Sequence, residues 1–344
     1  MRYIGSKANL LGFIEEVVKE FEPDLKDKTF CDLFTGTTSV ARHFKNKCGK
    51  VISNDLELYS YVVQRNYIKN NDNTDCESLI KKYKNTQGKH GILTEVLSPA
   101  GKQGRMFFMT KNAMKIDGIR DKIEEDYKKN KLTEDEYYFL LCSLMESADK
   151  VANTTGVYGA FLKNFKGTAS KDFVLRSFEP TIGTEDTEVY KMDANDLIAK
   201  IEGDVLYLDP PYNNRQYSSN YHVLNYICDP YNISIRKKFD KSLNKEVESK
   251  TAMGDYNISK YSRKAEAKQA FENLISKVKF KKVFVSYNDE GIMSTADIRE
   301  ILEKYGTYHL RTKQYKRYKS NNIEVDKKQV VEQVHVLIME DHND

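Results

Sequence analysis

The 344-residue chain has no tryptophan, only six prolines and only five cysteines. Without tryptophan, a ring that stacks on a ligand must come from its 23 tyrosines or 16 phenylalanines. The cysteines are odd in number and form no C-x-x-C pair, which is typical of reduced thiols in a reducing compartment. The six histidines form no H-E-x-x-H or comparable cluster, so the sequence predicts no metal site.

Long apolar runs are also missing. No stretch approaches the roughly 18 apolar residues of a membrane-spanning helix, and the N-terminal MRYIGSKANLLGF has no apolar core followed by a small-residue cleavage site. We therefore expect a cytoplasmic protein with no membrane partner. The net charge of +4 is too mild to indicate a polyanionic partner by itself. The basic stretch RTKQYKRYK (311–319) is either a solvated face or a segment that holds phosphates and stacks bases.

Strands that alternate with helices are predicted toward both ends of the chain. Apolar spacing indicates a first helix over 7–21 and an antiparallel strand pair at the C-terminal end. Five further segments are predicted strands: 29–34, 50–54, 188–194, 204–212 and 281–289. Most of them are followed by helical patterns, which favours an α/β fold with a doubly wound, Rossmann-like parallel sheet.

The middle of the chain has a different pattern. Residues 105–129 and 133–149 have helical spacing, and no strand is predicted between 71 and 185. We expect 1–70 and 186–344 to form one domain, into which 71–185 is inserted as a helical subdomain. The lysine-rich stretch 232–262 is predicted to be a long mobile loop over the site.

Carboxylates stand at or near the ends of three predicted strands, at Asp32, Asp55 and Asp193. In DLFTGTTS (32–39), Gly36 permits a ligand to approach the backbone closely, although an ordinary turn is the alternative. A single glycine matches neither the dinucleotide fingerprint nor a P-loop. Asp55 and Asp193 are each placed either to accept hydrogen bonds from ribose hydroxyls or to cap the next helix.

The strand that contains Val205 to Leu208 ends in Asp209-Pro210-Pro211-Tyr212. Proline has a fixed φ and no N–H, and it holds the preceding residue extended, so the carbonyl of Pro210 has a set direction. This carbonyl and the Asp209 carboxylate can accept from one amino group, beside the ring of Tyr212. A proline that merely stops a strand explains one of these residues but not the set. Together they predict a site for a planar base with an exocyclic amino group.

These residues resemble the S-adenosylmethionine-dependent DNA methyltransferases that modify the exocyclic amino group (N6) of adenine, in the permuted class called alpha. The resemblance is carried by DPPY (209–212), the D-x-F-x-G turn (32–36) and YIGSK (3–7), and it extends to 152–165 and 285–291. It implies a methyltransferase sheet with a mainly helical inserted target recognition domain. It further implies a site-specific enzyme acting on double-stranded DNA within a restriction-modification system, with a cognate restriction endonuclease as a partner.

The resemblance also implies roles for individual residues. The target adenine, flipped out of the duplex, would be held by Asp209, Pro210, Pro211 and Tyr212. The cofactor would be contacted by Tyr3, Lys7, Asp32, Phe34, Gly36, Asp55 and Asp193. DNA contacts are expected, by position, from Arg105, Lys115, Tyr158, Lys163, Arg215, Tyr217, Tyr221 and Arg317. Thr38 departs from the family pattern, which usually has a second glycine there, and so puts backbone contacts to the cofactor in question.

The same residues bear on four alternative functions. Methylation of the cytosine amino group more often uses a motif that opens with serine, and RNA or protein amide methylation uses N-P-P-[YF], so Asp209 favours adenine. A non-catalytic DNA-binding descendant is supported only by Thr38. A dehydrogenase would need the second and third glycines of the fingerprint. The recognised DNA sequence, the preference for hemimethylated sites and the oligomeric state stay open.

Overall fold

The computed structural model describes residues 3–71, 74–214, 216–231, 259–316 and 329–340. They form two compact units. We call Ser6–Leu56, Ile182–Gln216 and Ile258–Asp344 the sheet unit, and Met1–Gly5, Glu57–Thr181 and Tyr217–Asn257 the helical unit. None of the described helices is long and apolar enough to cross a membrane.

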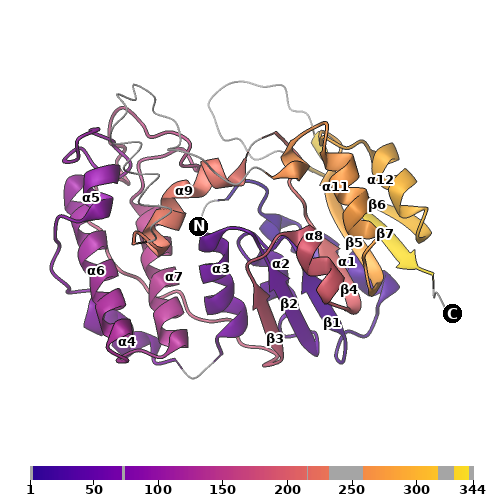
Figure 1. The fold of residues 1–344 in the computed structure, drawn as a ribbon, viewed down its shortest axis with the longest axis horizontal. Helices are drawn as coiled ribbons and strands as arrows, with labels where there is room; N and C mark the ends of the chain where they lie inside the picture. Colours follow the sequence, from indigo (N-terminus) through magenta and orange to yellow (C-terminus); the bar gives the residue numbers. More distant parts are fainter. Residues whose placement is uncertain (1–2, 72–73, 215, 232–258, 317–328, 341–344) are drawn as a thin grey trace. The chain divides into compact units, whose positions relative to one another are not determined.

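The sheet unit contains one seven-stranded sheet in the order β3-β2-β1-β4-β5-β7-β6 (Figure 1). Its strands are β1 (Thr29–Asp32), β2 (Lys50–Asn54), β3 (Thr187–Tyr190), β4 (Gly203–Leu208), β5 (Phe280–Asn288), β6 (Gly306–Lys316) and β7 (Gln329–Met339). The first five are parallel, whereas β7 runs antiparallel to both β5 and β6. The predicted α/β sheet and its antiparallel edge pair are confirmed.

Helices cover both faces of this sheet. They are η1 (Lys7–Asn9), α1 (Leu11–Phe21), α2 (Ser39–Phe44), α8 (Ala194–Leu197), η3 (Ile198–Lys200), η4 (Lys260–Ser262), α11 (Ala267–Ile275) and α12 (Thr295–Leu302). Alternate strand residues point to opposite faces. Cys31 therefore packs in the core formed with α8, α11 and α12, while its neighbour Phe30 stacks on Phe44 of α2 at 4.2 Å between ring centroids.

The helical unit consists of α3 (Leu58–Gln64), the π-helical η2 (Arg65–Lys69), α4 (Cys76–Tyr83), α5 (Ile92–Leu97), α6 (Thr110–Lys128), α7 (Glu134–Lys150) and α9 (Tyr217–Cys228). The predicted helix over 105–129 begins later, at Thr110, while α7 begins at a capping box between Thr133 and Glu136.

The divisions between the units differ from the predicted domain boundaries. The chain passes between units after residues 5, 56, 181, 216 and 257, whereas the sequence indicated a single insertion over 71–185. The physical reason is that α3 and α9 bury apolar side chains, such as Val63 and Leu224, in the same core as α6 and α7. That the helical unit recognises the DNA target stays a prediction.

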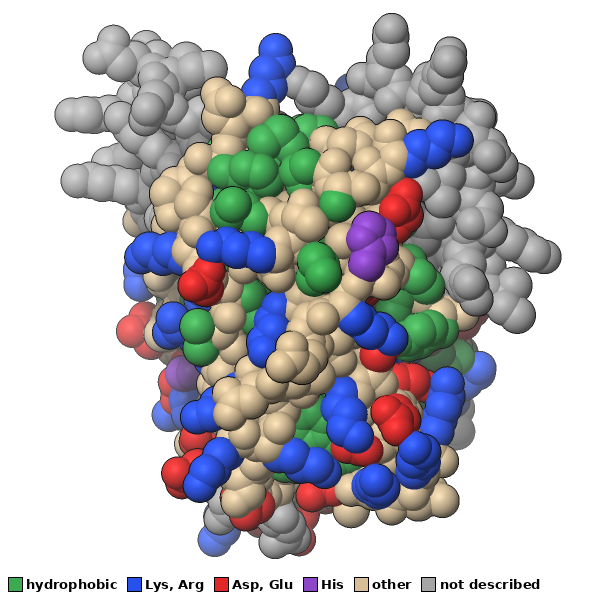
Figure 2. Space-filling view, turned by 90° about the vertical axis from the view of Figure 1, so that its left-hand side faces the viewer, with side chains coloured by type: hydrophobic (Ala, Val, Ile, Leu, Met, Phe, Trp, Pro, Cys, Tyr) green, Lys and Arg blue, Asp and Glu red, His purple; other side chains and the backbone are tan. Residues whose placement is uncertain are grey.

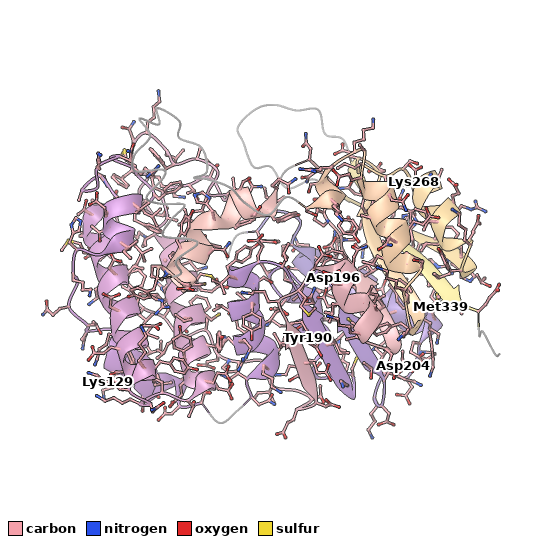
Figure 3. All side chains as sticks on the ribbon, viewed as in Figure 1. Lys129, Tyr190, Asp196, Asp204, Lys268 and Met339 are labelled. Carbon is pink, nitrogen blue, oxygen red and sulfur yellow. The ribbon has the colours of Figure 1, made fainter. Side chains whose placement is uncertain are left out.

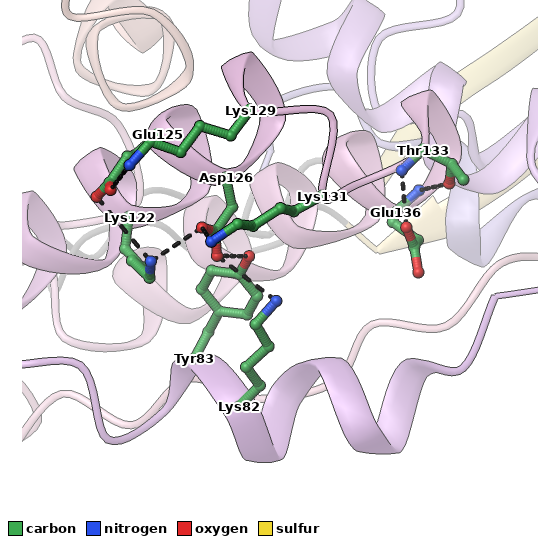
Figure 4. A network of polar contacts seen from close by, with 9 residues as sticks. All are labelled: Lys82, Tyr83, Lys122, Glu125, Asp126, Lys129, Lys131, Thr133 and Glu136. Carbon is green, nitrogen blue, oxygen red and sulfur yellow. Dashed lines mark hydrogen bonds and ion pairs between the residues drawn. The ribbon is translucent and has the colours of Figure 1, made fainter.

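A buried carboxylate joins α4 to α6 within the helical unit (Figure 4). Asp126, 1% exposed, accepts hydrogen bonds from Tyr83 Oη at 2.7 Å and Lys122 Nζ at 2.9 Å. The ammonium groups of Lys82 and Lys131 lie 3.5 and 3.8 Å from its oxygens. Burial alone would raise the pKa of Asp126, but these bonds and charges outweigh burial and lower the pKa to about 2.

Replacing this carboxylate tests its structural role. We expect Asp126→Ala to lower the free energy of unfolding by about 1–3 kcal/mol at pH 7, because the Tyr83 hydroxyl and three lysines lose their shared partner. The wild-type contribution is fully present above pH ~4, the pKa of an unfolded aspartate, and is lost as the pH falls through about 2.

Urea unfolding at several pH values measures both effects. Glu125→Gln is the matched control, because Glu125 is half exposed and forms a surface pair with Lys129 on the same helix; its expected cost is much smaller than that of Asp126→Ala, since exposed pairs contribute little. Equal losses for the two variants would contradict a special role for Asp126.

Candidate functional site

The predicted site residues of the sheet unit follow adjacent parallel strands. The turn around Gly36 follows β1, Asp55 follows β2 and Asp209 follows β4, and β1 lies between the other two strands. Asp204, labelled in Figure 3, stands near the start of β4 and marks the opposite edge of the sheet. In open α/β sheets, ligands bind at the carboxyl ends of the strands, so these three features share the edge where binding is expected.

Asp209 is held by a lysine from the N-terminal motif. Lys7 Nζ, in a side chain that is only 6% exposed, lies 3.2 Å from Asp209 Oδ1 and 2.8 Å from Glu332 Oε1 of β7. The Asp209 side chain itself is 18% exposed, so a ligand can reach it. Ser286 of β5 donates a second hydrogen bond, of 2.6 Å, to the same oxygen of Glu332.

The charges of this group influence one another strongly. Burial raises the pKa of Asp209 to about 6, with Glu332 adding to the rise and Lys7 opposing it. Burial works against a charged Lys7, but Asp209 and Glu332 outweigh it, so the Lys7 pKa lies well above its ordinary value. Near neutral pH the site therefore holds an ammonium, together with a carboxylate that can accept a proton.

Tyr212 is fixed by contacts on both its backbone and its ring. Its carbonyl accepts a hydrogen bond of 2.9 Å from the Ile292 N–H. Its ring meets Tyr287 edge to face at 6.2 Å between centroids, and Lys7 Nζ lies 5.6 Å from the centroid of the ring. Pro210 and Pro211 restrict the backbone between Asp209 and Tyr212. The Tyr212 ring and the Asp209 carboxylate are therefore both held close to the Lys7 ammonium.

The turn after β1 is built from strained and tightly bonded backbone. Gly36 has φ 54° and donates its N–H to Asp55 Oδ2 at 2.8 Å. Thr38 has φ 65°, in the left-handed region that β-branched residues rarely adopt. This conformation explains why a glycine would suit the position that Thr38 occupies. Asp55 thus supports the turn through one oxygen, in addition to its expected role toward a ribose.

The remaining cofactor candidates of the sheet unit are Asp32, Asp193 and Phe34. Asp32 is 1% exposed and accepts the Ala41 N–H at 3.1 Å, and burial, reinforced by Asp209, raises its pKa well above the ordinary value. Asp193 caps α8 by accepting the Asn195 N–H at 2.8 Å. Phe34 meets Tyr261 edge to face at 5.2 Å, and the Tyr261 hydroxyl bonds Asn195 Oδ1 at 2.7 Å.

Tyr3 belongs to the helical unit, where it stacks with two tyrosines of α9. The ring centroids are 5.4 Å apart for Tyr217 and 4.6 Å apart for Tyr221. The Ile4 N–H also donates to the Tyr221 hydroxyl at 2.7 Å. The N-terminal motif is therefore divided, with Tyr3 and Ile4 in the helical unit and Lys7 in the sheet unit.

The family of the chain follows from comparison with known proteins. A family model described as D12 class N6 adenine-specific DNA methyltransferase matches residues 3–317. The chain belongs to this family. It is therefore an adenine-specific DNA methyltransferase, which acts on DNA and uses a methyl donor, and the family predicted from the DPPY, D-x-F-x-G and YIGSK motifs is confirmed.

Similar proteins include several modification enzymes. The chain is 42% identical over 331 residues to the Type II methyltransferase M.NlaIII of Neisseria lactamica, and the match covers 94% of both proteins. It is 36% identical over 329 residues to M.CviAII of Paramecium bursaria Chlorella virus 1, with 92% of both covered. The modification methylase LlaI of Lactococcus lactis subsp. lactis is 33% identical over 337 residues, but the chain spans only 52% of its length.

The candidate DNA contacts of this methyltransferase occupy dissimilar positions. Arg105 is 5% exposed and its guanidinium donates to the Val96 carbonyl at 3.5 Å, while Tyr158 is fully buried and donates to Asp149 at 2.8 Å. Lys115 donates to the carbonyl of Thr86, whereas Lys163 is exposed. Buried side chains cannot meet a phosphate directly, so the burial of Arg105 and Tyr158 does not favour their expected contacts with DNA.

Other candidates cannot be placed or lie on a surface of mixed charge. Arg215, Arg317 and most of the lysine-rich stretch, 232–258, lie outside the described residues. Figure 2 shows basic and acidic side chains interspersed over the face of the helical unit that carries α5 and α6, so that face does not present charge of one sign. At the end of α6, Lys129 pairs with Glu125 at 2.6 Å.

The sequence reasoning missed Glu332, Ser286 and Tyr261. A signal for Glu332 exists, because QVVEQVHVLIM places one acid in an otherwise largely apolar strand, and a carboxylate in such a strand needs a partner. Within the described residues, no group of three or more His, Cys, Asp or Glu side chains is arranged to hold a metal ion.

The Lys7 cluster makes a prediction about stability. We expect Lys7→Met to lower the free energy of unfolding by about 3–5 kcal/mol at pH 8, because two carboxylates stay buried without their ammonium. The loss should be smaller at pH 5: without Lys7 the pKa of Asp209 rises further, and the folded state gains a proton as the pH falls.

Denaturant unfolding at the two pH values measures this difference. Lys304→Met is a suitable control, since Lys304 is 46% exposed and pairs with Glu272 at 2.7 Å on the surface; it should cost much less than Lys7→Met, because exposed ion pairs contribute little to stability. A Lys7→Met loss that does not change with pH would speak against an unpaired buried charge.

Proposed function

We propose that this methyltransferase transfers the methyl group of S-adenosylmethionine to N6 of an adenine in a short sequence of double-stranded DNA, as the modification enzyme of a restriction-modification system. The observation that carries the proposal is the Asp209 carboxylate, 3.2 Å from a buried ammonium and followed by Pro210, Pro211 and Tyr212. The Type II methyltransferases among its relatives support the modification role. A cognate restriction endonuclease and a cytoplasmic location belong to the same proposal.

The residues at the sheet edge fit S-adenosylmethionine. Gly36 lets a ligand approach the backbone closely after β1. Asp55, which follows β2, is a suitable acceptor for ribose hydroxyls. Oδ1 of Asp32 is buried without a hydrogen-bonding partner of suitable geometry in the described part of the chain. We propose that these residues of the sheet unit hold the cofactor together with Phe34 and Asp193; the contact expected from Tyr3 stays a prediction. When bound, the cofactor supplies a methyl carbon activated by its sulfonium.

The protein's own residues then activate the base. The lone pair of an adenine amino group is delocalised into the ring, which makes the nitrogen a poor nucleophile. Asp209 and the Pro210 carbonyl accept its two protons in hydrogen bonds and draw the nitrogen toward tetrahedral geometry, so that the lone pair points at the methyl carbon. Transfer of the methyl group would break its bond to the sulfonium sulfur as the bond to the adenine nitrogen forms. One amino proton would then pass to Asp209, whose pKa of about 6 suits a base near neutral pH.

Tyr212 holds the base in this position. A base inside a duplex cannot reach the Asp209 carboxylate, so we propose that the adenine flips out and stacks on the Tyr212 ring. Lys7 lies beside both groups, and we propose that it keeps the carboxylate aligned; its expected contact with the cofactor stays a prediction. Among the predicted DNA contacts, Lys163 is exposed, and we propose that it contacts the phosphate backbone of the DNA.

The reaction, the base and the site can be tested in one experiment. DNA from cells that express the wild-type chain should carry N6-methyladenine in one short sequence, and DNA from cells that express Asp209→Ala should carry none. In vitro, the variant should lose at least about a thousandfold in turnover, since it lacks both the hydrogen-bond acceptor and the proton acceptor.

Binding of S-adenosylmethionine by calorimetry separates catalysis from cofactor affinity, which should change by less than about threefold. Asp186→Asn is the control, because Asp186 is 64% exposed in the same unit. An Asp209→Ala enzyme that methylates adenine at near-wild-type rate would contradict the proposed catalytic role of Asp209.

The ring of Tyr212 is tested by a pair of variants. Tyr212→Ala should weaken capture of the target adenine by about 10- to 100-fold in kcat/KM, equivalent to the ~1–3 kcal/mol of a base–aromatic stack. Tyr212→Phe keeps the ring and should lose less than about fivefold. The two kcat/KM values decide the matter: an equally large loss in both would mean that the hydroxyl, rather than the ring, is what matters.

A further inference from the structure

Glu332 is a buried acid to which the reaction above gives no role. Its side chain is 1% exposed in β7, and its Oε1 accepts both the Lys7 ammonium at 2.8 Å and the Ser286 hydroxyl at 2.6 Å. Ser286 reaches it from the neighbouring strand, where Asn288 is the residue directly opposite Glu332 in the antiparallel register. A carboxylate at this depth costs several kcal/mol to desolvate, and an apolar residue would fill the strand more cheaply.

The position of Glu332 links it to Asp209 through one atom. Lys7 Nζ lies 3.2 Å from Asp209 and 2.8 Å from Glu332, so Glu332 holds the same nitrogen that pairs with the proposed catalytic carboxylate. Without Glu332, the ammonium would be free to follow Asp209 or to leave it. The Ser286 bond keeps the glutamate itself from turning away.

Glu332 also changes the electrostatic environment of Asp209. An ammonium beside Asp209 stabilises the carboxylate and makes it a weaker proton acceptor. Glu332 brings a second negative charge to the same ammonium, so the three side chains together carry a net charge of −1. Burial, followed by these two opposing charges, places the pKa of Asp209 at about 6.

Other titratable groups also face this cluster. Among the described residues they are Asp32 at the end of β1, whose pKa is raised by burial and by Asp209, and Tyr207 in β4, whose pKa is raised by burial and by Asp209 but lowered by Lys7. Neither contacts the Lys7 nitrogen at ion-pair distance in that part of the chain. Glu332 is thus the acid that shares this ammonium with Asp209.

We propose that Glu332 is a positioning residue for methyl transfer, which holds the Lys7 ammonium beside Asp209 and offsets its charge so that Asp209 remains an effective proton acceptor. This inference rests on the proposed role of Asp209. It adds a remote strand, β7, to the residues that determine the rate of the reaction.

The test is Glu332→Gln in the full chain, which preserves the shape of the side chain and removes the charge. In the wild type we expect kcat/KM to fall as the pH drops through about 6, as Asp209 becomes protonated. In the variant the Lys7 charge is no longer offset, so this acidic limb should move to lower pH by about one unit. The kcat at pH 8 should fall about tenfold or more, while the dissociation constant of S-adenosylmethionine changes by less than about threefold.

The matched control is Glu340→Gln, which removes an exposed charge just after the same strand and should leave both kcat and the pH profile unchanged. An active Glu332→Gln enzyme with a wild-type pH profile and kcat would overturn the inference. If Glu332→Gln does not fold, Ser286→Ala takes its place, because it frees the glutamate without altering charge; a fall in kcat of about two- to fivefold supports the inference, and an unchanged kcat contradicts it.

A measurement without turnover separates this inference from the proposed function. Carboxyl ¹³C NMR of aspartate-labelled protein follows the titration of Asp209, whose resonance is assigned with Asp209→Asn. Its pKa should fall in Glu332→Gln, and an unchanged pKa overturns the inference even if DNA methylation is intact. Conversely, a wild-type enzyme that does not methylate adenine would refute the proposed function while leaving the measured pKa to decide the link between Glu332 and Asp209.

Discussion

The ammonium of Lys7 is the interaction on which the candidate site depends, because it contacts two carboxylates. It lies within ion-pair distance of Asp209 after β4 and of Glu332 in β7, so a side chain from the beginning of the chain joins two strands that are far apart in sequence. A buried ammonium is stable only with such partners. The same nitrogen lies near the ring of Tyr212, so the charge, the carboxylate and the stacking face are held by one set of contacts.

The parallel sheet supplies the remaining constraint. Because β1 lies between β2 and β4, the turn at Gly36, the carboxylate of Asp55 and the DPPY motif follow neighbouring strands and share one edge. The backbone there is unusually restricted: two prolines follow Asp209, and Thr38 adopts a left-handed conformation with φ 65°. Restricted backbone of this kind is found where a fold must present groups to a ligand in a fixed geometry.

The division of the chain into two units passes through the motifs themselves. Tyr3 and Ile4 bond to the tyrosines of α9 in the helical unit, whereas Lys7 bonds in the sheet unit. Likewise, Tyr212 belongs to the sheet unit and Tyr217, five residues later, to the helical unit. The segments that carry the candidate site are therefore also segments that connect the two units covalently.

Local sequence patterns explain why several strand ends and the DPPY motif could be identified from the sequence. The strand ends at Asp32, Asn54 and Leu208 follow from apolar runs and turn residues within a few positions, and DPPY is specific because four adjacent residues combine. Arg105 and Tyr158, predicted as DNA contacts by their position in the chain, are buried, and a basic or aromatic residue gives no sign of its burial in the sequence alone. Their partners, the Val96 carbonyl and Asp149, are decided by how α5, α6 and α7 pack.

The sequence by itself determined the α/β class and the family to which the chain belongs, because the strand patterns and the DPPY, D-x-F-x-G and YIGSK motifs each depend on residues close together in the chain. Only the tertiary structure decided that Lys7 pairs with Asp209 and Glu332, that α3 and α9 belong to the helical unit, and that Thr38 stands in a left-handed conformation. The reason is physical: the position of a buried charge depends on the opposite charge that folding brings to it, and Glu332 is 325 positions away from Lys7.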